Sequence, residues 1–329
     1  SDNQTMKIWN HDCEETAALL RTFKGHTGSL NSIAMDDTHI LSGSDDYSMK
    51  LWDRESRALL HSFEGHASSV TAVAMDSSSF FSGGSDNTIK AWSRTNFELE
   101  TTIAIDGGTV YCLAVDASYI VGGTSNYLVN VWDRATYELL RSCTGHGSYV
   151  WSVAIDDSSI LSGSYDRTVK LWNKVSGEEI RTYEGHGNYV TSVSMNTTRV
   201  VSGSQDGTVK VWNKESGEVL HTLSSPRCGS VYAMKLNGNH IVSAAQDNQH
   251  SGQSLIVAWD LTSGLEIRTY ESHQGVIKGL AFDKTTIISC SDNQTMKIWN
   301  HDCEETAALL RTFKGHTGSL NSIAMDDTH

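Results

Sequence analysis

The stretch "GHGSYVWSVAIDDSSILSGSYDRTVKLWNKVSGEEIRTYEGH", residues 145–186, holds one full period of the pattern that decides the fold. Four short runs of apolar and β-branched residues, at 149–155, 159–163, 168–172 and 179–183, are separated by gaps rich in Asp, Ser, Gly and Asn. Short runs of this type favour strands, and the polar gaps favour tight turns. The period therefore predicts a four-stranded antiparallel meander.

The same period recurs along the whole chain of 329 residues. Tryptophans that end a phrase such as "RTVKLWN" stand at 9, 52, 92, 132, 172, 212, 259 and 299, and most are 40 residues apart; Trp151 lies outside this series. No stretch has the length and periodicity of a helix. One meander cannot bury both of its faces, so the units must stack on one another, and radial stacking gives a β-propeller. We predict an all-β, seven-bladed propeller, a single domain over 1–329, with four-stranded blades at approximately 29–63, 69–103, 109–143, 149–183, 189–223, 229–270 and 276–313.

The two ends of the chain are copies of one another, because residues 1–39 reappear without a substitution as residues 291–329. One copy is surplus to a seven-bladed ring, and the alternative is eight blades with one incomplete. Loop-closure entropy must decide which copy closes the ring. We expect residues 17–23 to pair with strands from 276–299, which would leave the other strands free to pair with a second molecule. Perfect copying points to engineering or to a very recent duplication.

Composition restricts the classes of partner. With 25 Lys and Arg against 39 Asp and Glu, the formal charge is −14, which repels nucleic acid and acidic membranes and favours basic peptides; the same charge also serves solubility. There is no apolar run long enough for a membrane span and no basic, apolar leader at the start. Six cysteines without CxxC spacing indicate reduced thiols in an intracellular, cytoplasmic protein.

The repeated phrases resemble those of the WD-repeat (WD40) propeller family. Gly-His stands about 26 residues before Trp-Asp or Trp-Asn, with "SGSxDxT" between them, and this register holds over seven units. The resemblance implies a buried hydrogen-bonded network of His, Ser or Thr, Asp and Trp in each blade. Four units match it fully: His26, Ser42, Asp46, Trp52; His66, Ser82, Asp86, Trp92; His146, Ser162, Asp166, Trp172; and His186, Ser202, Asp206, Trp212.

Three units depart from the network. The third carries Asp106, Gly122 and Asn126 around Trp132; the sixth has Pro226 in place of His, with Ser243, Asp247 and Trp259; the seventh keeps His273, Ser289 and Trp299 but has Asn293 for Asp. We expect these blades to be held more by packing than by hydrogen bonds, and to be locally softer.

No constellation of residues indicates catalysis, a metal or a cofactor. Recurring Ser, His and Asp could suggest a catalytic nucleophile, but four equivalent active sites in one ring are not expected. A buried chain of hydrogen bonds that ends on a Trp N–H is better explained by a structural role. "NHDCEE" at 10–15 contains metal-ligand types without the spacing of a structural zinc site, so we interpret it as a loop. The Gly-rich turns lack the GK[ST] of a phosphate loop. We predict a protein that is not an enzyme.

Equivalent positions of the seven units carry different residues on one face of the ring. This face is formed by the loops that enter the innermost strands and by the turns between second and third strands, and we call it the top face. We predict that a partner binds there, because aromatic side chains offer large contact area with few rotatable bonds; the alternative is that some rings plug the channel or pack between blades. The predicted contact residues are Tyr111, Tyr149, Trp151, Tyr165, Tyr189, Tyr232, Lys278, Asp45 and Asp292. In the sixth unit, a six-residue insertion between Asp247 and Trp259 should project from the same face.

The sequence therefore predicts a non-enzymatic protein-interaction scaffold that binds a peptide or protein on its top face, and the negative charge favours a basic partner. The alternative is the substrate-recognition propeller of a ubiquitin ligase, or a regulatory domain of a larger signalling protein. A phosphorylated degron would require several Arg at the top centre, where the sequence offers Lys278 with Arg167 and Arg227 nearby.

Overall fold

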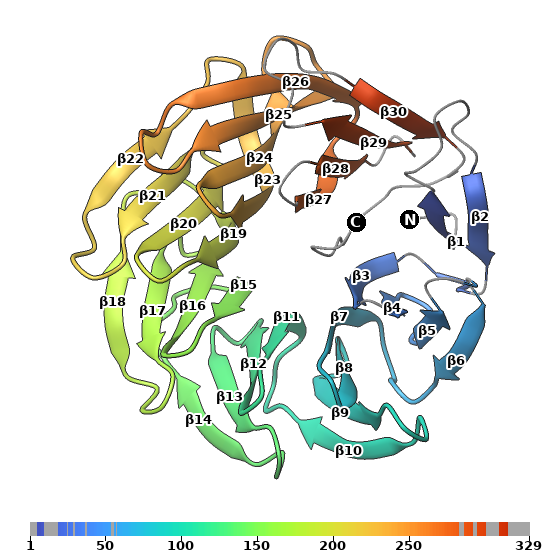
Figure 1. Ribbon diagram of the computed structural model, residues 1–329. Coiled ribbons are helices and arrows are strands. Elements are labelled where there is room, and N and C mark those ends of the chain that lie inside the picture. Colours follow the sequence, from blue (N-terminus) through green and yellow to red (C-terminus); the bar gives the residue numbers. More distant parts are fainter. Residues whose placement is uncertain are drawn as a thin grey trace.

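The computed structural model describes residues 5–9, 19–24, 26–28, 30–36, 38–53, 56, 58–282, 286–291, 295–300 and 309–314. Every regular element in these segments is a strand, and the strands are arranged as sheets around a ring (Figure 1). Within them no helix is long and apolar enough to cross a membrane. The all-β class predicted from the sequence is confirmed.

Seven sheets of four strands form the blades, and each is an antiparallel meander of consecutive strands. The first three blades contain β3 (Leu30–Met35), β4 (His39–Ser44), β5 (Met49–Asp53) and β6 (Leu59–Phe63); β7 (Val70–Met75), β8 (Ser79–Gly84), β9 (Thr88–Ser93) and β10 (Leu99–Ala104); β11 (Val110–Val115), β12 (Tyr119–Thr124), β13 (Val129–Asp133) and β14 (Leu139–Cys143). The fourth and fifth contain β15 (Val150–Ile155), β16 (Ser159–Ser164), β17 (Val169–Asn173) and β18 (Glu179–Tyr183); β19 (Val190–Met195), β20 (Arg199–Ser204), β21 (Val209–Asn213) and β22 (Val219–Leu223). The sixth and seventh contain β23 (Cys228–Asn237), β24 (His240–Asp247), β25 (Gln253–Asp260) and β26 (Glu266–Gln274); β27 (Ile277–Phe282), β28 (Thr286–Ser291), β29 (Thr295–Asn300) and β30 (Leu309–Lys314).

An eighth sheet has only two strands, β1 (Thr5–Trp9) and β2 (Leu19–Lys24). Figure 1 shows it in the sector of the ring between the seventh blade and the first. The seven four-stranded blades agree with the predicted fold class, and the two-stranded sheet stands where the alternative placed an incomplete eighth blade.

The expected closure of the ring is wrong. We expected residues 17–23 to complete the seventh blade, but β30 pairs with β29 along that blade, and β2 pairs with β1. The two copies carry identical side chains, so the contacts cannot favour one over the other. Strand β30 follows β29 after a short connection in the chain, whereas β2 lies far away in sequence, and the shorter loop costs less entropy to close.

The core lies between neighbouring blades. Trp212 of the fifth blade, for example, packs with Leu161 and Tyr183 of the fourth in one buried cluster. The Gly of the "SG" phrase permits this close stacking: a Cβ at Gly163 would lie 2.7 Å from Cγ1 of Val193 in the next blade. Small and large residues at fixed positions of the repeat thus set the distance between blades.

A belt of ion pairs joins blades on the side opposite the top face. The carboxylate stands in the turn after an innermost strand, and the cation follows the third strand of the next blade, 58 residues later; the pairs are Asp36–Arg94, Asp76–Arg134, Asp116–Lys174 and Asp156–Lys214. Burial alone would raise the pKa of Asp76, but the hydrogen bond from Arg134 helps to hold it below its usual value. At the same positions between the fifth and sixth blades stand Asn196 and Leu261.

Candidate partner-binding site

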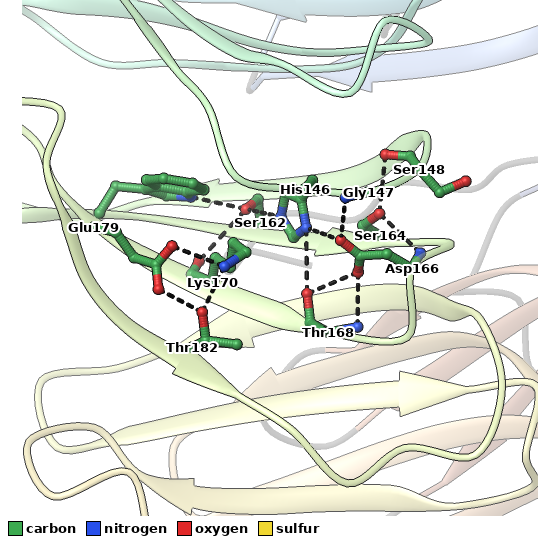
Figure 2. A network of polar contacts seen from close by, with 11 residues as sticks. His146, Gly147, Ser148, Ser162, Ser164, Asp166, Thr168, Lys170, Glu179 and Thr182 are labelled. Atoms are coloured by element: carbon green, nitrogen blue, oxygen red, sulfur yellow. Dashed lines mark hydrogen bonds and ion pairs between the residues drawn. The ribbon is translucent and has the colours of Figure 1, made fainter.

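The fourth blade shows how the buried network fixes the loops of the top face (Figure 2). Nδ1 of His146 lies 2.7 Å from Oδ2 of Asp166, and Nε2 lies 2.7 Å from Oγ of Ser162. The indole N–H of Trp172 donates to the same Oγ at 2.8 Å. Because the carboxylate can only accept, Nδ1 carries the proton and Nε2 accepts the hydroxyl of Ser162. The network ties the entry loop of the blade to its second and third strands.

Asp166 anchors this arrangement. Its Oδ2 also accepts the backbone N–H of Gly147 at 2.8 Å, and its Oδ1 accepts the N–H and the hydroxyl of Thr168 at 2.8 and 2.7 Å. Burial alone would raise the pKa of Asp166, but these hydrogen bonds, led by that from His146, hold it well below its ordinary value.

The structure brings the same four side chains together in the first, second and fifth blades. In the sets of His26, His66 and His186, His Nδ1 lies 2.8, 2.9 and 2.8 Å from the Asp carboxylate, and His Nε2 lies 2.8 Å from Ser Oγ in all three. The Trp N–H donates to the Ser hydroxyl in each set. Burial lowers the pKa of His26 and His66 in spite of the neighbouring carboxylate. The Ser and Trp of each set are buried, so no substrate can reach the hydroxyl.

The departing blades use other contacts. In the third blade, Nδ2 of Asn126 donates to the carbonyl of Asp106 at 2.7 Å, and the ring of Trp132 packs on Gly122, where a Cβ would lie 3.1 Å from Cζ3. This agrees with the expectation that packing holds the blade.

In the sixth blade both ends of the network are hydrogen-bonded, which we did not expect. Trp259 donates to Ser243 at 2.9 Å, and buried Asp247 accepts from Arg227 at 2.6 Å and from His250 at 3.1 Å. Arg227 therefore makes the contact to Asp that His makes in the other blades. The inserted residues lengthen β24 and β25 into an extended hairpin beside the other top-face turns. In the seventh blade, Asn293 and the side chains of His273, Ser289 and Trp299 lie outside the description.

Backbone hydrogen bonds join two parts of the top face in each of two blades: the residue just before the innermost strand and the turn between the second and third strands. The N–H of Tyr165, in the turn, donates at 2.9 Å to the carbonyl of Tyr149, which precedes β15, and Gln205 bonds Tyr189 in the same way in the fifth blade. The top-face side chains of a blade thus stand on one hydrogen-bonded base. A rigid base lowers the entropy that binding must offset.

Six aromatic rings form a continuous group, which we call the aromatic cluster. Tyr111, Tyr127, Tyr149, Trp151, Tyr165 and Tyr189 come from the third, fourth and fifth blades, and each ring lies within 6.2 Å, centroid to centroid, of another ring of the cluster. Tyr127, Tyr149, Trp151 and Tyr189 are 39 to 42% exposed, whereas Tyr111 and Tyr165 are half-buried between their neighbours.

The sequence did not point to Tyr127. It follows Asn126 in the turn and has a φ of 72°, and Tyr47 and Arg167 occupy the same left-handed position in the first and fourth blades. This conformation directs the side chain of the turn outward, as the exposure of Tyr47 and Tyr127 shows. The signal was present in the sequence: the position of Gly207 in "SQDGT" holds Tyr47, Tyr127 and Arg167 in the first, third and fourth blades, where φ above zero costs energy.

The other predicted contact residues lie elsewhere on the ring. Tyr232 is half-buried on β23, and exposed Asp45 accepts a hydrogen bond of 2.7 Å from Asn31 in the first blade. Lys278 belongs to β27, but its side chain, like Asp292 and the segment 10–15, lies outside the description. Among the described residues no group of three or more His, Cys, Asp or Glu is placed to hold a metal ion.

A ring of four-stranded meanders whose blades are fixed by His, Ser, Asp and Trp defines a WD-type β-propeller. The family model of the WD40 repeat (WD domain, G-beta repeat) matches residues 17–53, 57–93, 137–173, 177–213 and 264–300. The chain therefore belongs to the WD40 repeat family.

Curated relatives match over short segments. The chain is 45% identical over 42 residues to a Lissencephaly-1 homolog of Caenorhabditis briggsae, and 37% identical over 57 residues to DDB1- and CUL4-associated factor 13 of Dictyostelium discoideum. These segments cover 13% and 17% of this chain, and 10% and 13% of the two relatives. The crystal structure of the computationally designed Ika8 protein superimposes with a TM-score of 0.82 and 31% sequence identity, over 92% of both chains.

Proposed function

We propose that the protein is a non-enzymatic interaction scaffold that binds a peptide or protein partner on its top face. The observation that carries this proposal is the aromatic cluster, with four rings about two-fifths exposed on hydrogen-bonded turns. Interfaces draw most of their affinity from a few central aromatic residues, and rigid rings lose little entropy on binding. The formal charge of −14 steers basic partners toward the ring.

Two further features fit this proposal. The described cysteines, Cys112, Cys143 and Cys228, are free thiols whose pKa burial raises, as expected for inert side chains in an intracellular protein. The alternative of a phosphodegron receptor is weakened because Arg227, one of the cations that it would need, is paired with Asp247.

The test is capture of a partner from lysate by the immobilised chain and by the Trp151→Ala and Tyr189→Ala variants. We expect both variants to lose capture while keeping the melting temperature within a few degrees of the original. Tyr47→Ala is the matched control, since Tyr47 is an equally exposed tyrosine on a top-face turn of the first blade. Unchanged capture by both cluster variants would refute the top-face site.

An oligomer through the surplus strands is a separate part of the proposal. Among the described strands β1 pairs only with β2, and its sequence is that of β29, which pairs on both sides with β28 and β30. This edge of β1 is therefore open to the same edge of β1 in a second copy of the chain. Light scattering after size-exclusion chromatography should show a concentration-dependent dimer that disappears when residues 1–24 are removed; monomers in both cases would contradict it.

A further inference from the structure

The rings of the aromatic cluster are stacked, and this restricts what they can bind. The planes of Trp151 and Tyr165 are 17° apart with centroids at 4.9 Å, and those of Tyr165 and Tyr189 are 11° apart at 4.3 Å. Stacked faces cover one another, so Tyr165 has no free face for a cation. Tyr165 therefore presents its ring edge, which carries the positive end of the aromatic quadrupole.

The cluster also presents hydrogen-bond donors. Among the described residues, neither the hydroxyls of its five tyrosines nor the indole N–H of Trp151 has a hydrogen-bond partner; the tyrosines are Tyr111, Tyr127, Tyr149, Tyr165 and Tyr189. Tyrosine hydroxyls are protonated at neutral pH, and burial raises the pKa of Tyr111 and Tyr165 further. Exposed Arg167, in the turn beside Tyr165, adds further donors.

The carboxylate of Asp166, which follows Tyr165 in the chain, already accepts four hydrogen bonds from within its blade. Exposed Asp106 stands at the third-blade end of the cluster, where its carbonyl accepts the bond from Asn126, next to Tyr127. The surface therefore offers aromatic rings and hydrogen-bond donors, and the exposed residue Asp106 is bonded through its carbonyl to the turn that carries Tyr127.

A polyproline II segment is the complement of such a surface. Its carbonyls are free of internal hydrogen bonds and can accept from the cluster, while proline brings no N–H donor that would need an acceptor. Its rings pack on aromatic surfaces, and its stiffness lowers the entropy lost on binding. An extended peptide of other composition would also bring N–H groups, and the tyrosine hydroxyls, which can accept as well as donate, would then have to serve both kinds of partner.

The length of the stack agrees with this occupant. Successive centroid distances from Tyr111 through Trp151 and Tyr165 to Tyr189 are 4.9, 4.9 and 4.3 Å, so the stack extends for no more than about 14 Å. Five residues of polyproline II, at about 3.1 Å each, span roughly 15 Å.

We propose that the aromatic cluster binds a proline-rich segment in the polyproline II conformation, with a basic residue of that segment beside Asp106. The inference rests on the proposed function and names the chemistry of its partner. The rings supply contact area, the hydroxyls and the indole N–H bind carbonyls, and Asp106 sets the direction of the peptide.

The test is fluorescence anisotropy with two labelled peptides, one of an arginine followed by eight prolines, and one of an arginine followed by alternating alanine and serine of the same length. We expect the proline peptide to bind with a Kd in the micromolar range and the other peptide at least tenfold more weakly. Trp151→Ala should weaken binding more than tenfold. Tyr189→Phe, which keeps the ring and removes only the hydroxyl, should weaken it about fivefold, the effect of one ordinary hydrogen bond. Tyr47→Ala should bind as the original chain does.

Equal binding of the two peptides, or no binding of either, would overturn the inference. If capture from lysate depends on Trp151 while the proline peptide is ignored, the inference fails and the proposed function stands. If capture is also independent of Trp151, both fail. Melting curves of every variant establish that the loss of binding is not a loss of folding.

Discussion

Replacing Asp166 by Asn should destabilise the fourth blade, and the structure gives the reason atom by atom. The carboxylate accepts from His146 and Gly147 on one oxygen and twice from Thr168 on the other. An amide has one acceptor, so its NH2 group must face one of these pairs of donors. The less costly orientation turns the NH2 toward Thr168, whose hydroxyl can rotate to accept but whose backbone N–H then loses its partner.

The change therefore leaves one backbone donor unpaired and removes the negative charge from the bonds that remain. An unpaired donor costs about 1–3 kcal/mol, and hydrogen bonds to a charged group are stronger than neutral ones, so we expect a loss of about 3 kcal/mol. For a chain of 329 residues this corresponds to a fall in melting temperature of roughly 4 °C.

Differential scanning calorimetry on Asp166→Asn and on Asp157→Asn provides the assay. Asp157 is an exposed carboxylate of the same blade whose side chain makes no hydrogen bond or ion pair with a described residue, so its replacement controls for the loss of charge. The destabilisation should persist at pH 4, because the pKa of Asp166 lies well below that of an ordinary carboxyl. Equal melting temperatures for the two variants would refute the reasoning.

Three further predictions concern stability. In denaturant titrations from pH 7 to 3, stability should fall first below about pH 6.5, because burial lowers the pKa of His26 in the folded chain, and again below about pH 4, because the pKa of Asp46 is lowered to about 2; a flat profile contradicts both. Arg134→Met should cost about 2 kcal/mol in urea unfolding, since it leaves a half-buried carboxylate of the belt unpaired, and an unchanged midpoint would show that the belt is not stabilising. Gly122→Ser should lower the melting temperature although it restores the family residue, because the new Cβ would lie 3.1 Å from Trp132; a rise would mean that the ring moves aside.

The strands of the repeat could be predicted closely because local sequence decides them. The run predicted at 179–183 is β18, and that at 159–163 is β16 short of its last residue. Alternating β-branched residues and short polar turns act within one hairpin, so no distant partner is needed to interpret them. Closure of the ring depended instead on two identical copies, for which composition and pattern carry no information.

The contacts between blades could not be predicted in the same way. Asp76 and Arg134 are 58 residues apart and belong to different repeats. They occupy different positions of the repeat, so aligning the repeats does not show that they form a pair. The replacement of His by Arg227 in the sixth blade required the geometry of Asp247. The aromatic positions were visible in the sequence, whereas their parallel stacking, which decides the chemistry of the surface, was not.

The ion-pair belt has a consequence for how such a chain can grow. The second, third and fourth repeats each carry a carboxylate for the repeat after it and a cation for the repeat before it, as Asp116 and Arg134 do in the third blade. A repeat copied as a whole thus arrives with both halves of its couplings, and fits between any two neighbours that follow the same rule. Duplication of coding sequence can therefore lengthen such a chain by one blade at a time without inventing a new interface.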